Sequence, residues 1–145
     1  MQTITSLTQG TQDKIKTYNE DFKDIFSLFE KVVYKSDLEL FTTLVNELED
    51  INIQDSAYGW SLLHITIRRE ETAMVELLIE KGANIDIADG VGWTPLMEAI
   101  MDDKPALVKY LVEKGADKSI ANGRGATAPM LAQKFGRSTM FGYLA

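Results

Sequence analysis

The side chain best suited to chemistry in this sequence is His64, the only histidine among the 145 residues. An imidazole often serves as a general base, because its ordinary pKa lies near neutral pH. His64 closes the run Ser61-Leu62-Leu63-His64, and no nucleophile motif of a serine or cysteine enzyme accompanies it. A general base beside an acid is therefore one interpretation of His64. A histidine that only hydrogen-bonds its surroundings is the other, and the missing motif favours it.

Two glycine pairs could cradle a phosphate group. Neither Gly90-Val91-Gly92 nor Gly123-Arg124-Gly125 is followed by the residues that complete a dinucleotide fingerprint or a P-loop. Turns that need a positive φ explain both pairs better. The chain has no cysteine, and the single histidine offers no ligand spacing for zinc. The sequence thus predicts no catalytic, cofactor-binding or metal-ligating residue, and a protein that is not an enzyme.

The elements around these residues repeat along the chain. The clearest copy runs from Asp89 to Ala116 and has the pattern of a tight turn, a short helix, a reversal, a second helix and a glycine stop. An earlier stretch matches it at one offset of 33 residues, with Gly59, Trp60, Leu63, Val75, Leu78, Glu80, Lys81, Gly82 and Ala83 aligned to Gly92, Trp93, Leu96, Val108, Leu111, Glu113, Lys114, Gly115 and Ala116.

A period of 33 residues with this content resembles the ankyrin repeat. The resemblance implies an all-α fold, an ankyrin-repeat solenoid of stacked helix-turn-helix units with short β-turn fingers. It also implies a structural role for His64, since Ser61-Leu62-Leu63-His64 matches the family's Thr-Pro-Leu-His turn, whose imidazole hydrogen-bonds neighbouring turns. Glu70 and Asp103 stand where the family usually has glycine between the two helices, and this departure is expected to loosen that turn.

The predicted organisation is a leader followed by one domain. Residues 1–19 are polar, show no clear periodicity and are expected to be mobile. Residues 20–145 are expected to form about four repeats, with degenerate capping repeats at both ends, over 23–55, 56–88, 89–121 and 122–145. In the first repeat, Ser36-Asp37-Leu38-Glu39 has the spacing of a capping box and is expected to start the second helix. The linker from Asp55 to Ser61 is one residue longer than that from Asp89 to Thr94, so its finger should bulge.

The family resemblance also implies where a partner would bind. In ankyrin proteins the fingers and first helices line a concave groove, and the variable positions there face the partner. Carried onto this sequence, the partner-binding positions are Tyr34, Tyr58, Trp60, Arg68, Arg69, Val91, Trp93, Met101, Asp102, Arg124, Lys134 and Phe135, with Lys35 and Ala126 beside them. Tryptophan, tyrosine, arginine and methionine are enriched in protein interfaces. The alternative is that Trp60 and Trp93 stack on neighbouring fingers and serve the fold.

Charge narrows the classes of partner. The formal net charge is −7, of which residues 1–55 contribute −6 and residues 56–145 contribute −1. An acidic body argues against nucleic acid, whose backbone requires clustered lysine and arginine. It fits a basic protein better, although acidity can also serve solubility alone. No stretch has the length of a membrane span or the apolar core of a signal peptide, so a soluble cytoplasmic protein is expected.

The sequence therefore favours a protein-binding module that acts through the groove on another folded protein. An inhibitor is one form of this, such as a bacterial immunity protein that blocks a toxin, or a regulator of an enzyme. The alternative is a structural or assembly subunit that self-associates or scaffolds a complex, because Met140, Phe141, Tyr143 and Leu144 could leave apolar surface exposed. We expect a monomer when no partner is present.

Overall fold

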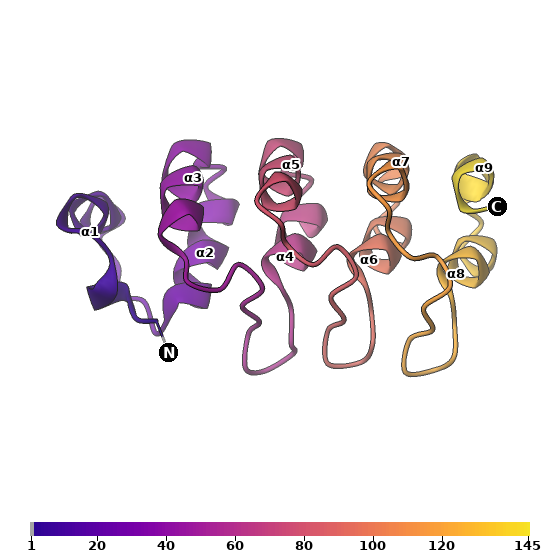
Figure 1. Ribbon diagram of the computed structural model, residues 1–145, viewed down its shortest axis with the longest axis horizontal. Helices are drawn as coiled ribbons and strands as arrows, with labels where there is room; N and C mark the ends of the chain where they lie inside the picture. The colour runs from indigo at the N-terminus through magenta and orange to yellow at the C-terminus, as the bar shows by residue number, and fades with distance from the viewer. Residues whose placement is uncertain (1) are drawn as a thin grey trace.

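The computed structural model describes residues 2–145 as two layers of short helices stacked along one axis (Figure 1). One layer holds the first helix of each repeat: α2 (Ile25–Tyr34), α4 (Leu62–Arg68), α6 (Pro95–Met101) and α8 (Ala128–Lys134). The other layer holds α3 (Leu38–Glu47), α5 (Thr72–Glu80), α7 (Pro105–Glu113) and α9 (Phe141–Leu144). Apart from one isolated bridge between Gln54 and Ser61, the regular structure in this part of the chain is helical. The predicted all-α solenoid is confirmed.

Three of the four first helices, α2, α4 and α6, begin after a residue whose side chain accepts a backbone hydrogen bond. Asp24 accepts from Ser27 N–H, and the corresponding caps of α4 and α6 are Ser61 and Thr94. The second helix of the first repeat, α3, is capped by Asp37. The expectation that Ser36 opens a capping box there is wrong. Ser36 has φ 54° and lies in the turn before the cap.

The turn between the two helices of a repeat has the same form four times. Ser36, Glu70, Asp103 and Gly136 take φ values of 54°, 54°, 56° and 68°, and in each case the following N–H donates to a carbonyl five residues back. A loosened turn at Glu70 and Asp103 was therefore the wrong expectation. These two non-glycine residues adopt the left-handed conformation instead, which is strained for them.

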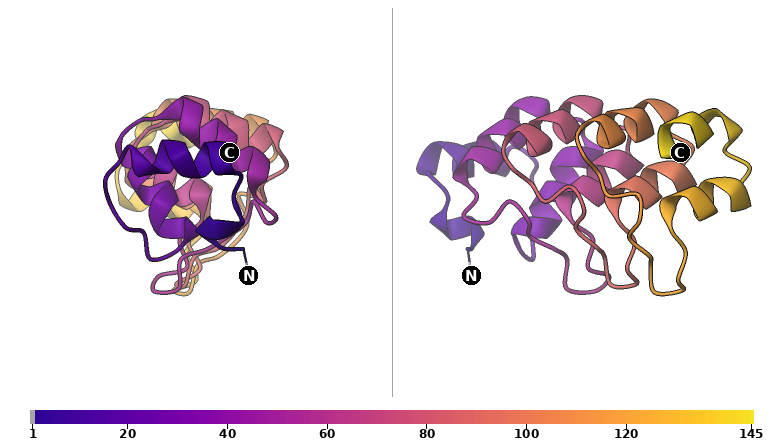
Figure 2. Two further views of the ribbon diagram at one scale, coloured as in Figure 1. Left: turned by 90° about the vertical axis from the view of Figure 1, so that its left-hand side faces the viewer. Right: turned by 45° about the vertical axis from the view of Figure 1, so that its right-hand side comes forward.

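Three loops project from the first layer as fingers (Figures 1 and 2). We define finger 1 as residues 55–61, finger 2 as 89–94 and finger 3 as 122–127. One side chain closes each finger by accepting two backbone N–H groups, and these side chains belong to Asp55, Asp89 and Asn122. Finger 1 holds one more residue than finger 2 inside the same closing hydrogen bond, as the longer linker predicted.

The fingers are also joined to one another. Gly90 N–H donates to Tyr58 C=O over 2.8 Å, and Gly123 N–H donates to Val91 C=O over 2.9 Å. A Cβ at Gly90 or Gly123 would lie 2.9 Å from the carbonyl oxygen that accepts the bond. Only glycine allows this approach, so these glycines serve the fold.

Residues 2–19 differ from the mobile leader expected there. They form a 3-10 turn over Ile4–Ser6 and helix α1 (Gln9–Lys16), which lies across the end of the stack (Figure 2, left). Leu7 and Ile15 are buried in the core. The Glu47 carboxylate at the end of α3 accepts hydrogen bonds from Thr8 and Thr11. This segment covers the apolar face that the first repeat would otherwise expose.

Candidate functional site

The predicted partner-binding residues lie along the fingers and the ends of the first helices. We call this surface the finger–helix strip. Seven of its members are exposed, namely Tyr34, Tyr58, Arg69, Val91, Met101, Arg124 and Lys134. The other five are partly buried, namely Trp60, Arg68, Trp93, Asp102 and Phe135. None is fully buried, so every predicted position is available for contact.

The centre of the strip is a three-layer stack of side chains. The rings of Tyr58 and Trp60 lie 4.6 Å apart between centroids with an interplanar angle of 23°. The Arg68 guanidinium lies 4.2 Å from the centroid of the Trp60 ring. Guanidinium and indole attract each other in this geometry through the ring quadrupole. Trp60 therefore packs on its own finger and on α4, whereas the alternative expected it to stack on a neighbouring finger.

Arg68 connects this stack to the carboxyl group of Glu98 on α6, which in turn lies beside Asp102 at the end of that helix. Its Nη2 donates to Glu98 Oε1 over 2.6 Å, and Glu98 is only 8% exposed. Burial raises the pKa of Asp102 to about 6, and a hydrogen bond to Glu98 together with the charge of Glu98 adds to the shift. Asp102 Oδ2 is buried and has no partner when both groups are ionised. Below about pH 6, a proton held by Asp102 can be donated to Glu98, which gives this oxygen a partner.

A second cationic group surrounds Tyr34 at the end of α2. The Arg69 guanidinium lies 4.9 Å and Lys31 Nζ 5.7 Å from the centroid of the Tyr34 ring. Lys31 also pairs with Glu20 over 2.6 Å. Tyr34 and Arg69 are both exposed, so the ring holds a guanidinium in place at the surface without hiding it.

The third group surrounds Phe135 at the C-terminal end of the strip and is separate from the groups around Trp60 and Tyr34. Lys134 and Arg137 lie 5.9 Å and 6.0 Å from the Phe135 ring. Arg137 also donates to the backbone carbonyls of Ile100 and Met101. The structure thus divides the predicted residues into local groups around Tyr34, Trp60 and Phe135, and it leaves Val91, Trp93 and Arg124 on the fingers outside these aromatic–cation contacts.

Sequence reasoning missed Glu98, Lys31 and Arg137. Glu98 aligns with the apolar Ile65 of the preceding repeat, so an acid at a core position was the available signal. Lys31 and Arg137 gave no comparable signal, because they contact the strip from outside the matched positions.

The strip differs in charge from the rest of the protein. Among the twelve predicted residues four are basic (Arg68, Arg69, Arg124 and Lys134) and only Asp102 is acidic, whereas the chain carries −7. At contact distance the local charge outweighs distant charges, since salt screens beyond about 8 Å.

His64 lies beneath the strip and has no exposed surface. Its Nδ1 accepts from Ser61 N–H over 3.1 Å, which leaves the proton on Nε2 to donate to Trp93 C=O over 2.8 Å. Burial lowers the pKa of His64, so the neutral ring is favoured. The imidazole joins two repeats, which is the structural role that the family resemblance implied.

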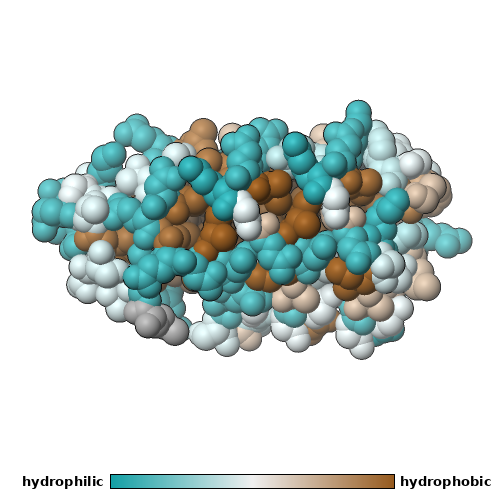
Figure 3. Space-filling view, viewed as in Figure 1, coloured by the Kyte–Doolittle hydropathy of each residue, from teal (hydrophilic) through white to brown (hydrophobic). Residues whose placement is uncertain are grey.

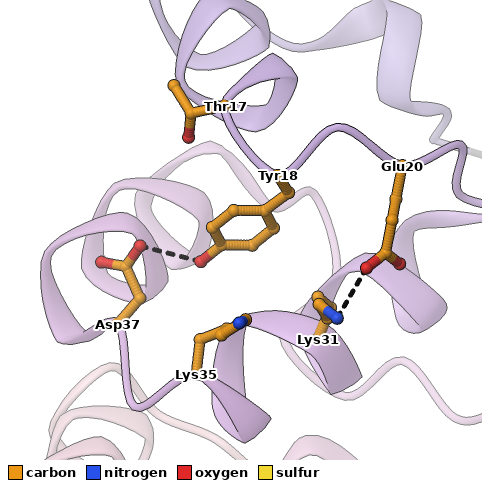
Figure 4. A pocket seen from close by; sticks show the side chains of 6 residues that line it. All are labelled: Thr17, Tyr18, Glu20, Lys31, Lys35 and Asp37. Carbon is orange, nitrogen blue, oxygen red and sulfur yellow. Dashed lines mark hydrogen bonds and ion pairs between the residues drawn. The ribbon is translucent and has the colours of Figure 1, made fainter.

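A cleft of about 470 Å³ lies between the end of α1 and helix α2 (Figure 4). Tyr18 donates to Asp37 Oδ2 over 2.8 Å across it, and Glu20 pairs with Lys31. Burial raises the pKa of Tyr18, and the hydrogen bond to Asp37 adds to this. This hydrogen bond and this ion pair cross the cleft, so they attach the N-terminal segment to the first repeat.

Two further properties of residues 2–145 bear on function. No cluster of three histidine, cysteine or acidic side chains in that range has the geometry to hold a metal ion. None of the helices there is both long and apolar enough to cross a membrane.

Comparison with known proteins agrees with the geometry. A family model of ankyrin repeats, in three copies, matches residues 29–122. A search of curated proteins finds no match. Ankyrin repeats are in general protein–protein interaction modules and typically not enzymes. The matched range covers more than half of the chain and includes fingers 1 and 2 with the helices around them. The chain therefore belongs to the ankyrin-repeat family.

Proposed function

We propose that this protein binds another folded protein through the finger–helix strip and has no catalytic activity of its own. An inhibitory role, such as that of an immunity protein which blocks a toxin or an enzyme, is the form of this function that we favour. A cytoplasmic location and a monomeric free state belong to the same proposal.

The observation that carries the proposal is the stack of Tyr58, Trp60 and Arg68. Aromatic and arginine side chains dominate the binding energy of many interfaces. Ordering a long side chain on binding costs about 0.5–1.5 kcal/mol, and Arg68 is already held by Trp60 and Glu98. A partner that covers this stack meets a surface that is organised before binding.

The charge expected of the partner differs between long range and the contact surface. The net charge of −7 favours approach of a basic protein at long range. The strip itself is cationic around Tyr34, where Arg69 and Lys31 surround the ring. We therefore expect the partner to carry an acidic or aromatic patch where it touches the strip, even if its overall charge is basic.

Co-purification from native lysate with the tagged protein tests the proposal. We expect a partner that is retained by the unmodified protein and lost with Trp60→Ala, which should weaken binding by about 2 kcal/mol or more. Trp93→Ala should weaken it less, since Trp93 lacks the stacked arginine. Arg69→Glu should also release the partner.

Lys109→Glu on α7 is the matched control, because it makes the same charge change at an exposed position outside the strip. Melting temperatures separate lost binding from lost folding. If Trp60→Ala, Arg69→Glu and Lys109→Glu all retain the partner equally, the strip is not part of the interface.

The alternative function, a self-associating or scaffolding subunit, is favoured by one observation. Met130 and Phe141 are 56% and 46% exposed near α8 and α9, and Tyr143 is 36% exposed. Apolar surface of this kind can mark an association site. A molecular mass that rises with protein concentration, and that falls back in Met130→Glu, would favour this alternative over the monomeric binding protein.

A further inference from the structure

A second surface, distinct from the finger–helix strip, lies at the base of finger 1. We call it the end groove. It encloses about 650 Å³ between the N-terminal segment, the start of α2 and the loop after α3. Its floor is apolar and consists of Ile25, Phe26, Leu48 and Ile53. In the space-filling view hydrophobic surface shows along the middle of the molecule, between hydrophilic side chains (Figure 3).

The end groove occupies the place where another finger would precede finger 1. Fingers 2 and 3 each donate a glycine N–H to the finger before them, from Gly90 and Gly123. Finger 1 has Ser56 at that position, and among residues 2–145 no group accepts from its N–H. The first repeat has no finger of its own over this apolar floor, which is left as a groove.

Ser56 also limits what can occupy the groove. A Cβ at the equivalent Gly90 would lie only 2.9 Å from the carbonyl oxygen of the preceding finger. Because Ser56 carries this atom, a finger of a second copy cannot approach in the way that neighbouring fingers do. An occupant must be recognised through side chains in the groove, rather than by extending the row of fingers.

The rim of the groove is acidic. Asp24, Glu49 and Asp50 line it and are exposed, and no lysine or arginine does so. Asp24 and Asp50 each use one carboxylate oxygen for a backbone N–H, of Ser27 and Asn52, which leaves the other oxygen available. The same negative charge acts on the nearby Glu30. Burial raises the pKa of Glu30, and the charges of Asp55 and Asp24 raise it further.

We propose that the end groove binds an extended segment of a partner protein in which apolar side chains alternate with lysine or arginine. The apolar side chains cover the floor, and the cations pair with the rim carboxylates. An apolar floor with a few charged groups at its edge is the usual composition of a peptide-binding site. This site is independent of the strip, so either can exist without the other.

A fluorescently labelled peptide of alternating leucine and lysine, followed by fluorescence anisotropy, tests this inference. We expect saturable binding, much weaker binding of a serine–lysine peptide, and none of a leucine–glutamate peptide. The double variant Glu49→Lys/Asp50→Lys should bind the leucine–lysine peptide at least about tenfold more weakly, through loss of opposite charge at the rim.

The matched control is Glu76→Lys/Glu80→Lys on α5, which makes the same charge change at exposed positions outside the groove. This control should keep the affinity of the unmodified protein. Equal losses in the two double variants, or equal binding of the serine–lysine peptide, would reduce the effect to net charge and overturn the proposal.

Nuclear magnetic resonance locates the peptide without any substitution. We expect amide shifts in residues 24–26 and 48–54, and not around Tyr34 and Arg69. Shifts confined to the strip would overturn the proposal. So would self-association that Glu49→Lys/Asp50→Lys abolishes, because the occupant would then be a second copy of the chain.

Discussion

The two junctions between neighbouring fingers have the same backbone and different side chains. At each junction a glycine N–H donates to the preceding finger, from Gly90 to Tyr58 and from Gly123 to Val91. The donor–acceptor distances, 2.8 Å and 2.9 Å, are nearly equal. The repeat therefore fixes how closely the fingers approach, whichever side chains they carry.

The first junction has an additional polar link. His64 connects Ser61 to Trp93 C=O, whereas the same position of the next repeat holds Met97, which is buried and apolar. One repeat is thus joined to its neighbour through hydrogen bonds, and the next through packing alone at this position. The comparison shows that the repeat specifies the backbone, while each interface is stabilised by its own side chains.

The largest expected effect tests the shared backbone. Gly59 and Gly92 have φ values of 73° and 82°, and a Cβ at either would lie 2.7 Å from the backbone nitrogen of the next finger. Gly125, in finger 3, has φ 79° but no atom within 4 Å of such a Cβ. Gly59→Ala and Gly92→Ala should each cost about 3 kcal/mol of unfolding free energy, and Gly125→Ala only about 1. Urea unfolding of the three variants measures this, and equal losses would show that the junctions do not restrict the fingers.

The next effect tests the difference between the junctions. His64→Met copies the second junction into the first and leaves Ser61 N–H without its acceptor. We expect a loss of about 2 kcal/mol, typical of an unsatisfied buried group. Met97→Leu, which keeps an apolar contact apolar, should cost less than about 1.5 kcal/mol. Thermal unfolding of both variants at neutral pH provides the comparison, and a smaller loss for His64→Met than for Met97→Leu would contradict it.

A smaller effect concerns the ends of α4 and α6, where Arg69 and Asp102 occupy equivalent positions. Burial raises the pKa of Asp102 from its ordinary value of 3.8 to about 6 in the folded protein, so its contribution to stability is present at low pH and is lost as the pH rises through about 6. Relative to Asp102→Asn, the unmodified protein should lose about 1 kcal/mol between pH 4 and pH 7, after allowance for solvent screening. If the unfolding free energies of the two proteins change with pH in parallel, Asp102 does not hold the proton.

The smallest expected effect is a gain in unfolding free energy. Glu70→Gly and Asp103→Gly relieve a left-handed conformation that costs a non-glycine residue about 1–2 kcal/mol. Part of this gain is offset, because Glu70 pairs with Lys104 over 2.9 Å and surface pairs contribute up to about 1 kcal/mol. We expect a net rise of about 0.5 kcal/mol in each, and a fall for Gly136→Ala. Destabilisation by both glycine variants would assign more weight to the ion pairs than to the backbone.

The parts of the fold that the sequence predicted are those that repeat. Gly59 and Gly92 stand at one offset with their following tryptophans, and that spacing identified both the register and the fingers. Helix α1 was missed because Ile15 is the one large apolar residue in its sequence, and its contacts depend on hydrogen bonds to Glu47, far away in the sequence. A polar segment that docks on a distant carboxylate has no periodic pattern to detect.

The candidate site was predicted as a set of positions and not as contacts. Trp60 was identified from its place after Gly59, yet its partners Tyr58 and Arg68 follow from side-chain geometry that the repeat pattern does not contain. An acid at a core position marked Glu98 as unusual, but its pairing with Arg68 of the preceding repeat was not predictable, for the same reason. The repeat period and the composition predict which positions form the binding surface, whereas pairwise contacts across repeats can be seen only in the structure.

The single carboxylate of Glu47 has a consequence for local opening of the molecule. Burial acts to raise the pKa of Glu47, but its hydrogen bonds from Thr11 and Thr8 outweigh burial and hold that pKa below its usual range. Their contribution is therefore present at neutral pH and is lost as the pH falls through the lowered pKa. We therefore expect acid to loosen the attachment of α1 before it affects the glycine-linked fingers, so that backbone amides of residues 9–16 exchange with solvent while those of α4 and α6 remain protected.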